Sequence, residues 1–327
     1  MNQSKNHIRF LVFIPALLLG FTYYAQEVPS LKENIPYMVT FGLNSDTSLG
    51  DDDFSQTVFF AVPKQHLAPV YVRIFDPETF GGLDEIKEGA NTRMKYFVYG
   101  GKDSYSDKDA RNTNPVGNYK SGTLLYSRIF GSEKETDQKW VSMGPFNPEQ
   151  GEFVAELDAY VFKVIIDGMK GNDGNIYKLF LSTKNTENVA VEGGNAFVYE
   201  YSVRLQMAAY SLAHLYPYAD NLVTSINISC FDFDNDGQIK LYSNVKNGHL
   251  VTTMDNNEWS HSIHPIIEEE HNKCLDLQIV KNGDFKNDMV FYITNQYNAP
   301  IPLFIKPIGE LPKYKYKISV KSIVKPK

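Results

Sequence analysis

The sequence is poor in several kinds of residue, and each scarcity excludes a class of protein. Only two cysteines occur among 327 residues, which excludes a fold held by a disulfide framework. Positive charge is not in excess, because 32 Lys and Arg stand against 39 Asp and Glu, giving a formal net charge of −7. That balance argues against nucleic acid or an anionic membrane surface as the partner. After residue 26, no apolar run is long enough to cross a bilayer as a helix.

The sequence motifs of common enzyme classes are also missing. There is no His-Glu-x-x-His, no Gly-x-Ser-x-Gly, no phosphate-binding loop and no dinucleotide fingerprint. Catalytic triads and carboxylate pairs assemble from residues far apart in the sequence, so a hydrolase with a divergent site stays open. The sequence nevertheless favours a binding protein over an enzyme.

The N-terminus has the pattern of a secretory signal peptide. Lys5 and Arg9 precede the apolar run 10–21, and the small residue Ala25 follows. We predict that residues 1–25 are a signal peptide cleaved after Ala25, with an uncleaved N-terminal anchor as the alternative. The Tyr-Ala-Gln sequence at 24–26 and the Asn-, Lys- and Tyr-rich chain after it resemble exported proteins of Bacteroidota. This resemblance implies a protein that is periplasmic, associated with the outer membrane or secreted.

Apolar and polar residues alternate along most of the remaining chain, and Gly, Asn, Asp and Pro clusters interrupt the alternation at short intervals. This pattern predicts an all-β fold of antiparallel β-sandwiches. The predicted strands are 37–43, 57–62, 70–75, 92–99, 152–158, 160–167, 176–182, 197–205, 222–233, 238–243, 275–280, 289–294 and 313–321. In segment 197–205, every second residue from Phe197 to Leu205 would lie on one face of the strand. Only segment 206–215 has the composition of a helix.

The length after the signal peptide suggests two domains. We predict a first β-sandwich at 26–207 and a second at 208–327, each jelly-roll-like. Three matches suggest an internal duplication. They are Phe75-Asp76 with Phe231-Asp232, Asp137…Trp140 with Asn256…Trp259, and Asn172-Asp173…Tyr177 with Asn287-Asp288…Tyr292.

The clearest ligand motif is the run at 232–239. Asp232, Asp234 and Asp236 alternate and are followed by Gly237, which resembles the first half of an EF-hand calcium loop and the Asp-rich loop of FG-GAP propeller blades. The resemblance implies Ca²⁺ bound by the three carboxylates and by the carbonyl of Gln238. It ends there, because Ser243 stands where an EF-hand has its bidentate Glu. The alternative is a β-hairpin that turns at Asp236-Gly237 without an ion.

A second acidic turn follows the predicted strand 70–75. Asp76, Asp84 and Glu85 would converge on Ca²⁺ if the glycines at 81 and 82 fold the loop back. The run 51–53, three aspartates, is a third candidate. The alternative for these turns is a set of solvated acids.

Histidine, cysteine and tryptophan offer further candidates. His261, His264 and His271 lie close in sequence, but residues three apart on a strand point to opposite faces, so we expect a polar surface rather than a zinc site. Cys230 and Cys274 can form one disulfide; the predicted strand faces favour two separate thiols. Trp140 and Trp259 either belong to the core of each sandwich or form a platform for stacking sugars.

From these observations we expect an exported, non-catalytic module that binds a glycan or a protein, with calcium ordering its loops. The alternative is a structural or accessory subunit of an outer-membrane or cell-surface assembly. No nucleic acid partner and no transmembrane helix in the mature chain are expected.

Overall fold

The computed structural model describes residues 27–50, 54–87, 89–111, 119–309 and 311. The predicted signal peptide, the acidic run 51–53 and the predicted strand 313–321 lie outside the described residues. Within them the chain is all-β, and every strand pairing is antiparallel, which confirms the fold class predicted from the sequence.

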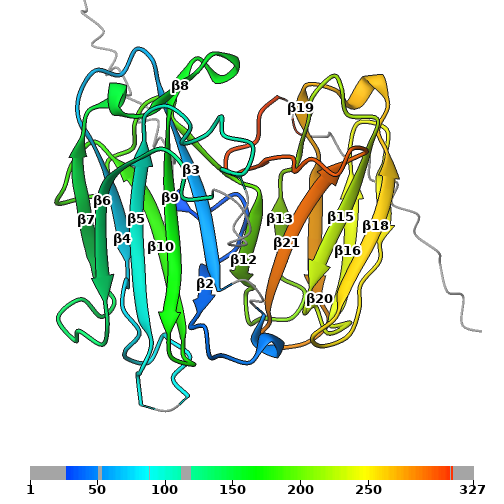
Figure 1. Cartoon of the computed structure of the whole chain (residues 1–327). Coiled ribbons are helices and arrows are strands. Elements are labelled where there is room, and N and C mark those ends of the chain that lie inside the picture. Colours follow the sequence, from blue (N-terminus) through cyan, green and yellow to red (C-terminus); the bar gives the residue numbers. More distant parts are fainter. Residues whose placement is uncertain (1–26, 51–53, 88, 112–118, 310, 312–327) are drawn as a thin grey trace, which may run out of the picture.

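One long sheet runs through the whole molecule (Figure 1). Its order is β18 (Trp259–Pro265), β15 (Ser225–Phe231), β21 (Asp288–Asn295), β12 (Glu200–Arg204), β2 (Tyr37–Phe41), β10 (Gly174–Ser182), β4 (Val70–Phe75) and β7 (Trp140–Phe146), with β1 (Glu27–Val28) paired to β10. The strands β2 and β12 lie in the middle of the molecule, so this sheet spans both halves of the chain.

Separate sheets cover the two halves of the long sheet. One has the order β22 (Leu303–Phe304), β11 (Asn195–Val198), β3 (Ser55–Pro63), β9 (Ala159–Lys170), β5 (Arg93–Gly100) and β6 (Thr123–Phe130), with β8 (Glu152–Val154) paired to β9. Another has the order β13 (Leu212–Leu215), β20 (Asp276–Lys281), β16 (Gly237–Tyr242) and β17 (Asn247–Val251), and β14 (Tyr218–Ala219) pairs with β19 (Lys273–Cys274). Short 3-10 helices lie in loops at Thr47–Leu49, Pro148–Gln150, Ala155–Leu157 and Glu268–Glu270.

The chain therefore forms two units with the same strand order. In the first unit, β2-β10-β4-β7 faces β3-β9-β5-β6; in the second, β12-β21-β15-β18 faces β13-β20-β16-β17. β11 and the two- and three-residue strands are additions to a common set of eight strands in each unit. In that set the first, eighth, third and sixth strands lie opposite the second, seventh, fourth and fifth, which is the order of a jelly roll. The units share the long sheet and one continuous hydrophobic core, which contains Val72 of the first and Ile228 of the second.

Corresponding strands also keep the same register. Phe75 pairs with Trp140 in the first unit as Phe231 pairs with Trp259 in the second. These pairs agree with two of the matches seen in the sequence.

The third sequence match is out of register. Arg73 pairs with Phe180 as Ser229 pairs with Tyr292, so the counterpart of Tyr292 is Phe180 and not Tyr177. Spacing from an Asn-Asp pair misled the alignment because the turns before β10 and β21 have different lengths.

The predicted strand 152–158 is shorter in the structure, because β8 ends at Val154 and a 3-10 helix follows. The predicted strand 197–205 differs from the structure in two respects. It divides into β11 and β12, which belong to different sheets, so Phe197 and Tyr201 lie in separate core clusters rather than on one face. The strand order also assigns β12 to the second unit, whereas the sequence placed it before the boundary at residue 207.

The expected helix at 206–215 is wrong. Its last residues form β13, which pairs with β20 and buries Ala213 and Leu215. Tyr210 adopts a left-handed conformation with φ of 59°, which interrupts a helix. Pairing with a neighbouring strand overrides the local helix propensity here.

Candidate metal centre

Three carboxylates from two loops converge at one end of the first unit. Asp76 and Glu78 lie at the start of the β4–β5 loop, and Asp137 lies three residues before β7 in the β6–β7 loop. Their ligand oxygens all lie within 4.8 Å of one another, and within the described part of the chain no other three His, Cys, Asp or Glu side chains do so. The group consists only of oxygen donors, so the chemistry of the site suits a hard cation.

Backbone contacts hold the two loops together at this point. Asp76 adopts a left-handed conformation with φ of 57°, and its Oδ1 accepts a hydrogen bond from the Gln138 backbone N–H at 2.7 Å. The Thr79 N–H donates to the carbonyl of Gly131 in the other loop at 3.0 Å. Gly81 is required by its φ of 96° and because a Cβ there would lie 2.5 Å from Oδ1 of Asp137.

Three carboxylate oxygens of the cluster are buried without hydrogen-bond partners. Asp76 and Glu78 are both 0% exposed, and Oδ2 of Asp76 and both carboxylate oxygens of Glu78 accept no hydrogen bond. No salt bridge involves any of the three acids among the described residues. Burial raises the pKa of Asp76 to about 7, and burial and the charge of Asp137 raise the pKa of Glu78. A cation between these oxygens would remove the cost of burying them unpaired.

The other two acids predicted for this turn have different roles. Asp84 lies next to the cluster and closes the loop, because its two oxygens accept hydrogen bonds from the N–H groups of Phe80 at 2.8 Å and Ile176 at 2.7 Å. Burial raises the pKa of Asp84 to about 9 despite these two donors. Glu85 points away from the cluster and forms ion pairs with Arg204 at 2.9 Å and Lys286 at 2.6 Å.

The turn at 232–236 connects β15 to β16, which belong to opposing sheets, so the hairpin alternative for this motif is wrong. Oδ1 of Asp232 accepts the Asn257 N–H at 2.7 Å, and Oδ2 of Asp236 accepts from Asn287 at 3.0 Å. The three aspartates do not come within 4.8 Å of one another as a group. Burial and the charge of Asp234 raise the pKa of Asp232 to about 7.

The remaining two residues of the motif belong to β16. Gly237 and Gln238 pair with Lys281 and Val280 of β20. A Cβ at Gly237 would lie 1.9 Å from the Val280 carbonyl oxygen, so the glycine permits close strand pairing rather than a sharp turn. The Gln238 side chain is exposed.

Both tryptophans lie on the outer face of the long sheet, not in the core between the sheets. Each is half-buried, and each contacts the phenylalanine that ends the neighbouring strand, Phe75 for Trp140 and Phe231 for Trp259. The guanidinium of Arg73 lies over the Trp140 ring at 5.4 Å. The Trp259 ring contacts Tyr292 at 5.1 Å and stacks with His261 at 6.5 Å.

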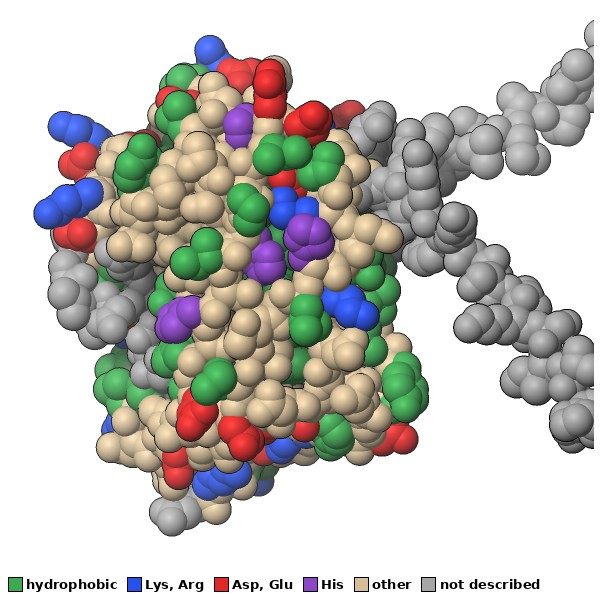
Figure 2. Space-filling model, turned by 90° about the vertical axis from the view of Figure 1, so that its right-hand side faces the viewer, with side chains coloured by type: hydrophobic (Ala, Val, Ile, Leu, Met, Phe, Trp, Pro, Cys, Tyr) green, Lys and Arg blue, Asp and Glu red, His purple; other side chains and the backbone are tan. Residues whose placement is uncertain are grey.

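The three histidines His261, His264 and His271 have different hydrogen-bond partners. His261 binds Ser229 at 2.9 Å, His264 binds Ser262 at 3.0 Å, and His271 binds the Val223 carbonyl at 3.0 Å. Figure 2 shows two histidines close together on the face that it presents and others apart from them. The rings of His249 and His264 have centroids 6.4 Å apart. None of them joins a group of three metal-ligating side chains among the described residues, as expected from the strand pattern.

The two cysteines are free thiols, and both are buried. Sγ of Cys230 lies 2.8 Å from the Ser260 hydroxyl, and Sγ of Cys274 accepts the Ile308 N–H at 3.2 Å. Burial raises their pKa values to about 11 and about 12, respectively. The inference from strand faces, that the thiols are separate, is confirmed.

Sequence reasoning missed two of the three acids in the cluster. Glu78 lies inside the acidic turn that was singled out, two residues after Asp76. Asp137 had a weaker signal, because it stands three residues before Trp140 in the proposed repeat. The amino-acid sequence of neither loop contains a signal that the two loops meet.

Comparison with models of protein families finds no match to this chain, and comparison with curated proteins finds none either. Among the described residues, no helix has the length and apolar character needed to cross a membrane.

Proposed function

We propose that the protein is an exported, non-catalytic binding protein whose first unit binds Ca²⁺ through Asp76, Glu78 and Asp137. The observation that carries the calcium site is the group of buried carboxylate oxygens without hydrogen-bond partners. Ca²⁺ accepts six to eight oxygens in irregular geometry, including bidentate carboxylates, whereas Mg²⁺ demands a near-ideal octahedron. Three acids from two loops suit Ca²⁺, because it tolerates irregular coordination geometry better than Mg²⁺ does.

The bound ion would order the β4–β5 loop. This loop covers the centre of the long sheet, since Leu83 packs against the cluster of Val39, Phe41 and Ile176. The same loop reaches the second unit through the ion pair of Glu85 with Arg204. Calcium would therefore stabilise a segment that fastens the two units together.

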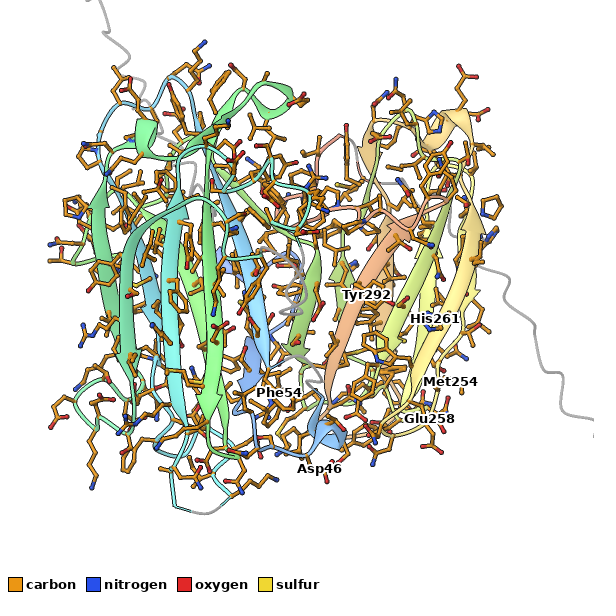
Figure 3. All side chains as sticks on the ribbon, viewed as in Figure 1. Asp46, Phe54, Met254, Glu258, His261 and Tyr292 are labelled. Atoms are coloured by element: carbon orange, nitrogen blue, oxygen red, sulfur yellow. The ribbon has the colours of Figure 1, made fainter. Side chains whose placement is uncertain are left out.

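We propose a glycan as the ligand and the aromatic group of the second unit as its contact surface. Trp259, Tyr292 and His261 lie together on the outer face of the long sheet, where His261 is exposed and Ile263 beside it is 74% exposed. Figure 3 shows His261 and Tyr292 at similar height, with Met254 and Glu258 below them. Phe54 of the β2–β3 loop lies nearer the middle of the molecule, and Asp46 of the same loop lies at the lower border. Flat rings beside carboxylate and imidazole groups supply both the stacking surface and the hydrogen-bonding groups that a sugar needs.

Thermal unfolding with EDTA and with millimolar Ca²⁺ tests the metal site. Ca²⁺ is expected to raise the unfolding midpoint, with a stabilisation of about 2.7 kcal/mol at a concentration 100 times the dissociation constant. Asp76→Asn combined with Glu78→Gln should remove most of this rise, and Glu156→Gln, an exposed acid, should leave it unchanged. Equal midpoints of the unaltered protein with EDTA and with Ca²⁺ would refute the calcium site.

Tryptophan fluorescence tests the glycan surface. In a Trp140→Phe variant, Trp259 is the only tryptophan of the chain. Titration with chitotetraose, laminaritetraose, xylotetraose and maltotetraose should shift its emission for at least one sugar, and Tyr292→Ala should weaken that response. Unchanged emission with all four, together with no heat of binding by calorimetry, would remove the glycan proposal and leave the metal site intact.

A further inference from the structure

The turn at 232–236 occupies the same place in the second unit as the carboxylate cluster of Asp76, Glu78 and Asp137 does in the first. Asp76 and Asp232 directly follow the equivalent residues Phe75 and Phe231 and have φ values of 57° and 63°. Each accepts a backbone N–H at 2.7 Å, from Gln138 in one unit and from Asn257 in the other.

The residues that donate these two bonds are equivalent as well. Gln138 and Asn257 each stand two residues before the tryptophan of their unit, and both have left-handed conformations, with φ of 52° and 58°. The two units therefore have the same backbone conformation at the aspartate that accepts this hydrogen bond and at the residue that donates it.

A buried asparagine contacts each turn. In the first unit it is Asn175 of β10, and in the second it is Asn287, the residue before β21. Asn175 is 0% exposed and its Nδ2 lies 3.4 Å from the Pro77 carbonyl; Asn287 is 4% exposed and its Nδ2 lies 3.4 Å from the Phe233 carbonyl. Pro77 and Phe233 each follow the first aspartate of their turn. The Oδ1 atoms of both asparagines have no hydrogen-bond partner.

In the second unit this asparagine lies directly against the acids of the turn. Its Nδ2 donates to Oδ2 of Asp236 at 3.0 Å, so the amide group of Asn287, with its unpartnered Oδ1, lies within the turn. Oδ1 of Asp234, the counterpart of Glu78, is also buried without a partner. The second turn thus offers two carboxylates and a neutral amide oxygen at the position of the carboxylate cluster in the first unit.

We propose that the turn at 232–236 is a second cation site, which takes a hard divalent cation through Asp232, Asp234 and Oδ1 of Asn287. It is weaker than the first site, because Asn256 stands where the first unit has Asp137, so that a neutral amide replaces one of the carboxylate ligands. Sites with few charged ligands bind Ca²⁺ with dissociation constants of roughly 10⁻⁴ to 10⁻³ M. This inference rests on the calcium site proposed for the first unit, since it extends that chemistry to the equivalent turn.

Titration of the full chain with CaCl₂ in a calorimeter tests the inference. Two binding events of different affinity are expected. Asp76→Asn with Glu78→Gln should remove the tighter event, and Asp232→Asn with Asp234→Asn should remove only the weaker one. A single event that is lost in the first variant and unchanged in the second would overturn the second site while the first stands. No event at all in the unaltered protein would refute the first site, and the second with it.

Terbium luminescence gives a readout that does not depend on the acidic variants folding. Tb³⁺ binds at calcium sites and emits when a nearby tryptophan is excited. Trp140 lies beside the first turn through its pairing with Phe75, and Trp259 lies beside the second through Phe231. Trp259→Phe should remove the emission from the weaker second site, which saturates at high Tb³⁺ concentration. Trp140→Phe should remove the emission from the tighter first site, which saturates at low Tb³⁺ concentration. Loss of all emission in Trp140→Phe alone would contradict a site beside Trp259.

Discussion

Met38 and Val203 occupy equivalent positions in the two units and pair directly with each other across β2 and β12. The equivalence follows from the register, because Met38 pairs with Tyr177 of β10 as Val203 pairs with Met289 of β21. A local twofold axis therefore passes between these two residues. The short strands β11 and β22 pair with each other in the same way. Pairing equivalent edges joins the two jelly rolls into one sheet and covers a strand edge that each unit would otherwise expose.

The differences between equivalent positions show where the units diverge. Asp137 corresponds to Asn256, which changes the charge of the acidic turn. Arg73 corresponds to Ser229, which changes what lies over the tryptophan of each unit.

Asn256→Asp is expected to strengthen cation binding at the second turn. The variant restores the third carboxylate present in the first unit, and an added charge of this kind raises the affinity roughly tenfold, equivalent to about 1.4 kcal/mol. The weaker calcium event in calorimetry should shift to lower concentration, while the tighter event stays in place. An unchanged weaker event would show that residue 256 does not face the ion.

Arg73→Ala is expected to expose Trp140. Arg73 lies over the indole ring, and its guanidinium is held by the Ser142 hydroxyl at 3.1 Å and by the side chain of Asn188. Acrylamide quenching, measured in a Trp259→Phe background so that only Trp140 emits, should increase on removal of the arginine. Lys184→Ala, an exposed residue of the neighbouring loop, is the matched control and should leave the quenching constant unchanged.

Arg204→Met is expected to destabilise the protein by roughly 3 to 5 kcal/mol, because it leaves a buried carboxylate without its partner. Arg204 is 8% exposed and binds both oxygens of Asp288, at 2.7 and 2.6 Å. The free energy of unfolding in urea measures the effect.

The exposed ion pair of Lys184 and Glu187 provides the comparison for Arg204. Both side chains are more than half exposed, so Lys184→Met should change the free energy of unfolding by less than about 1 kcal/mol. If Arg204→Met were as mild as Lys184→Met, the buried network would not contribute to joining the units.

The strands with clear alternation could be predicted from the sequence, whereas their partners could not. The apolar alternation of 70–75 matches β4, but β6 was missed because most of its side chains are exposed and its sequence lacks alternation. The same limit applies to the carboxylate cluster of Asp76, Glu78 and Asp137. Asp76 was found from its turn, but its approach to Asp137 depends on the pairing of β4 with β7, which is not encoded by any local period.

Glu33 is expected to make stability fall as pH rises. Its side chain is 1% exposed, and Oε2 accepts the Ser30 N–H at 2.6 Å. Burial raises the pKa of Glu33 from its ordinary value of 4.5 to about 8, so the folded protein favours the neutral acid. Its favourable contribution is complete below about pH 4.5 and is lost as pH rises through about 8, at a rate of up to about 1.4 kcal/mol per pH unit.

Glu33→Gln removes this pH dependence, because the amide keeps the size of the side chain but does not ionise. The free energy of unfolding in urea should be similar for the variant and the unaltered protein near pH 5, and the variant should become progressively more stable than the unaltered protein towards pH 8. Glu156→Gln, which changes an exposed acid, should show a difference that stays constant over the same range. Parallel curves for Glu33→Gln would mean that Glu33 ionises in the folded protein as readily as it does in water. In that case the segment 29–35, which is tied to the second unit through the bond from the His214 N–H to the Glu33 carbonyl, would be open to solvent in solution.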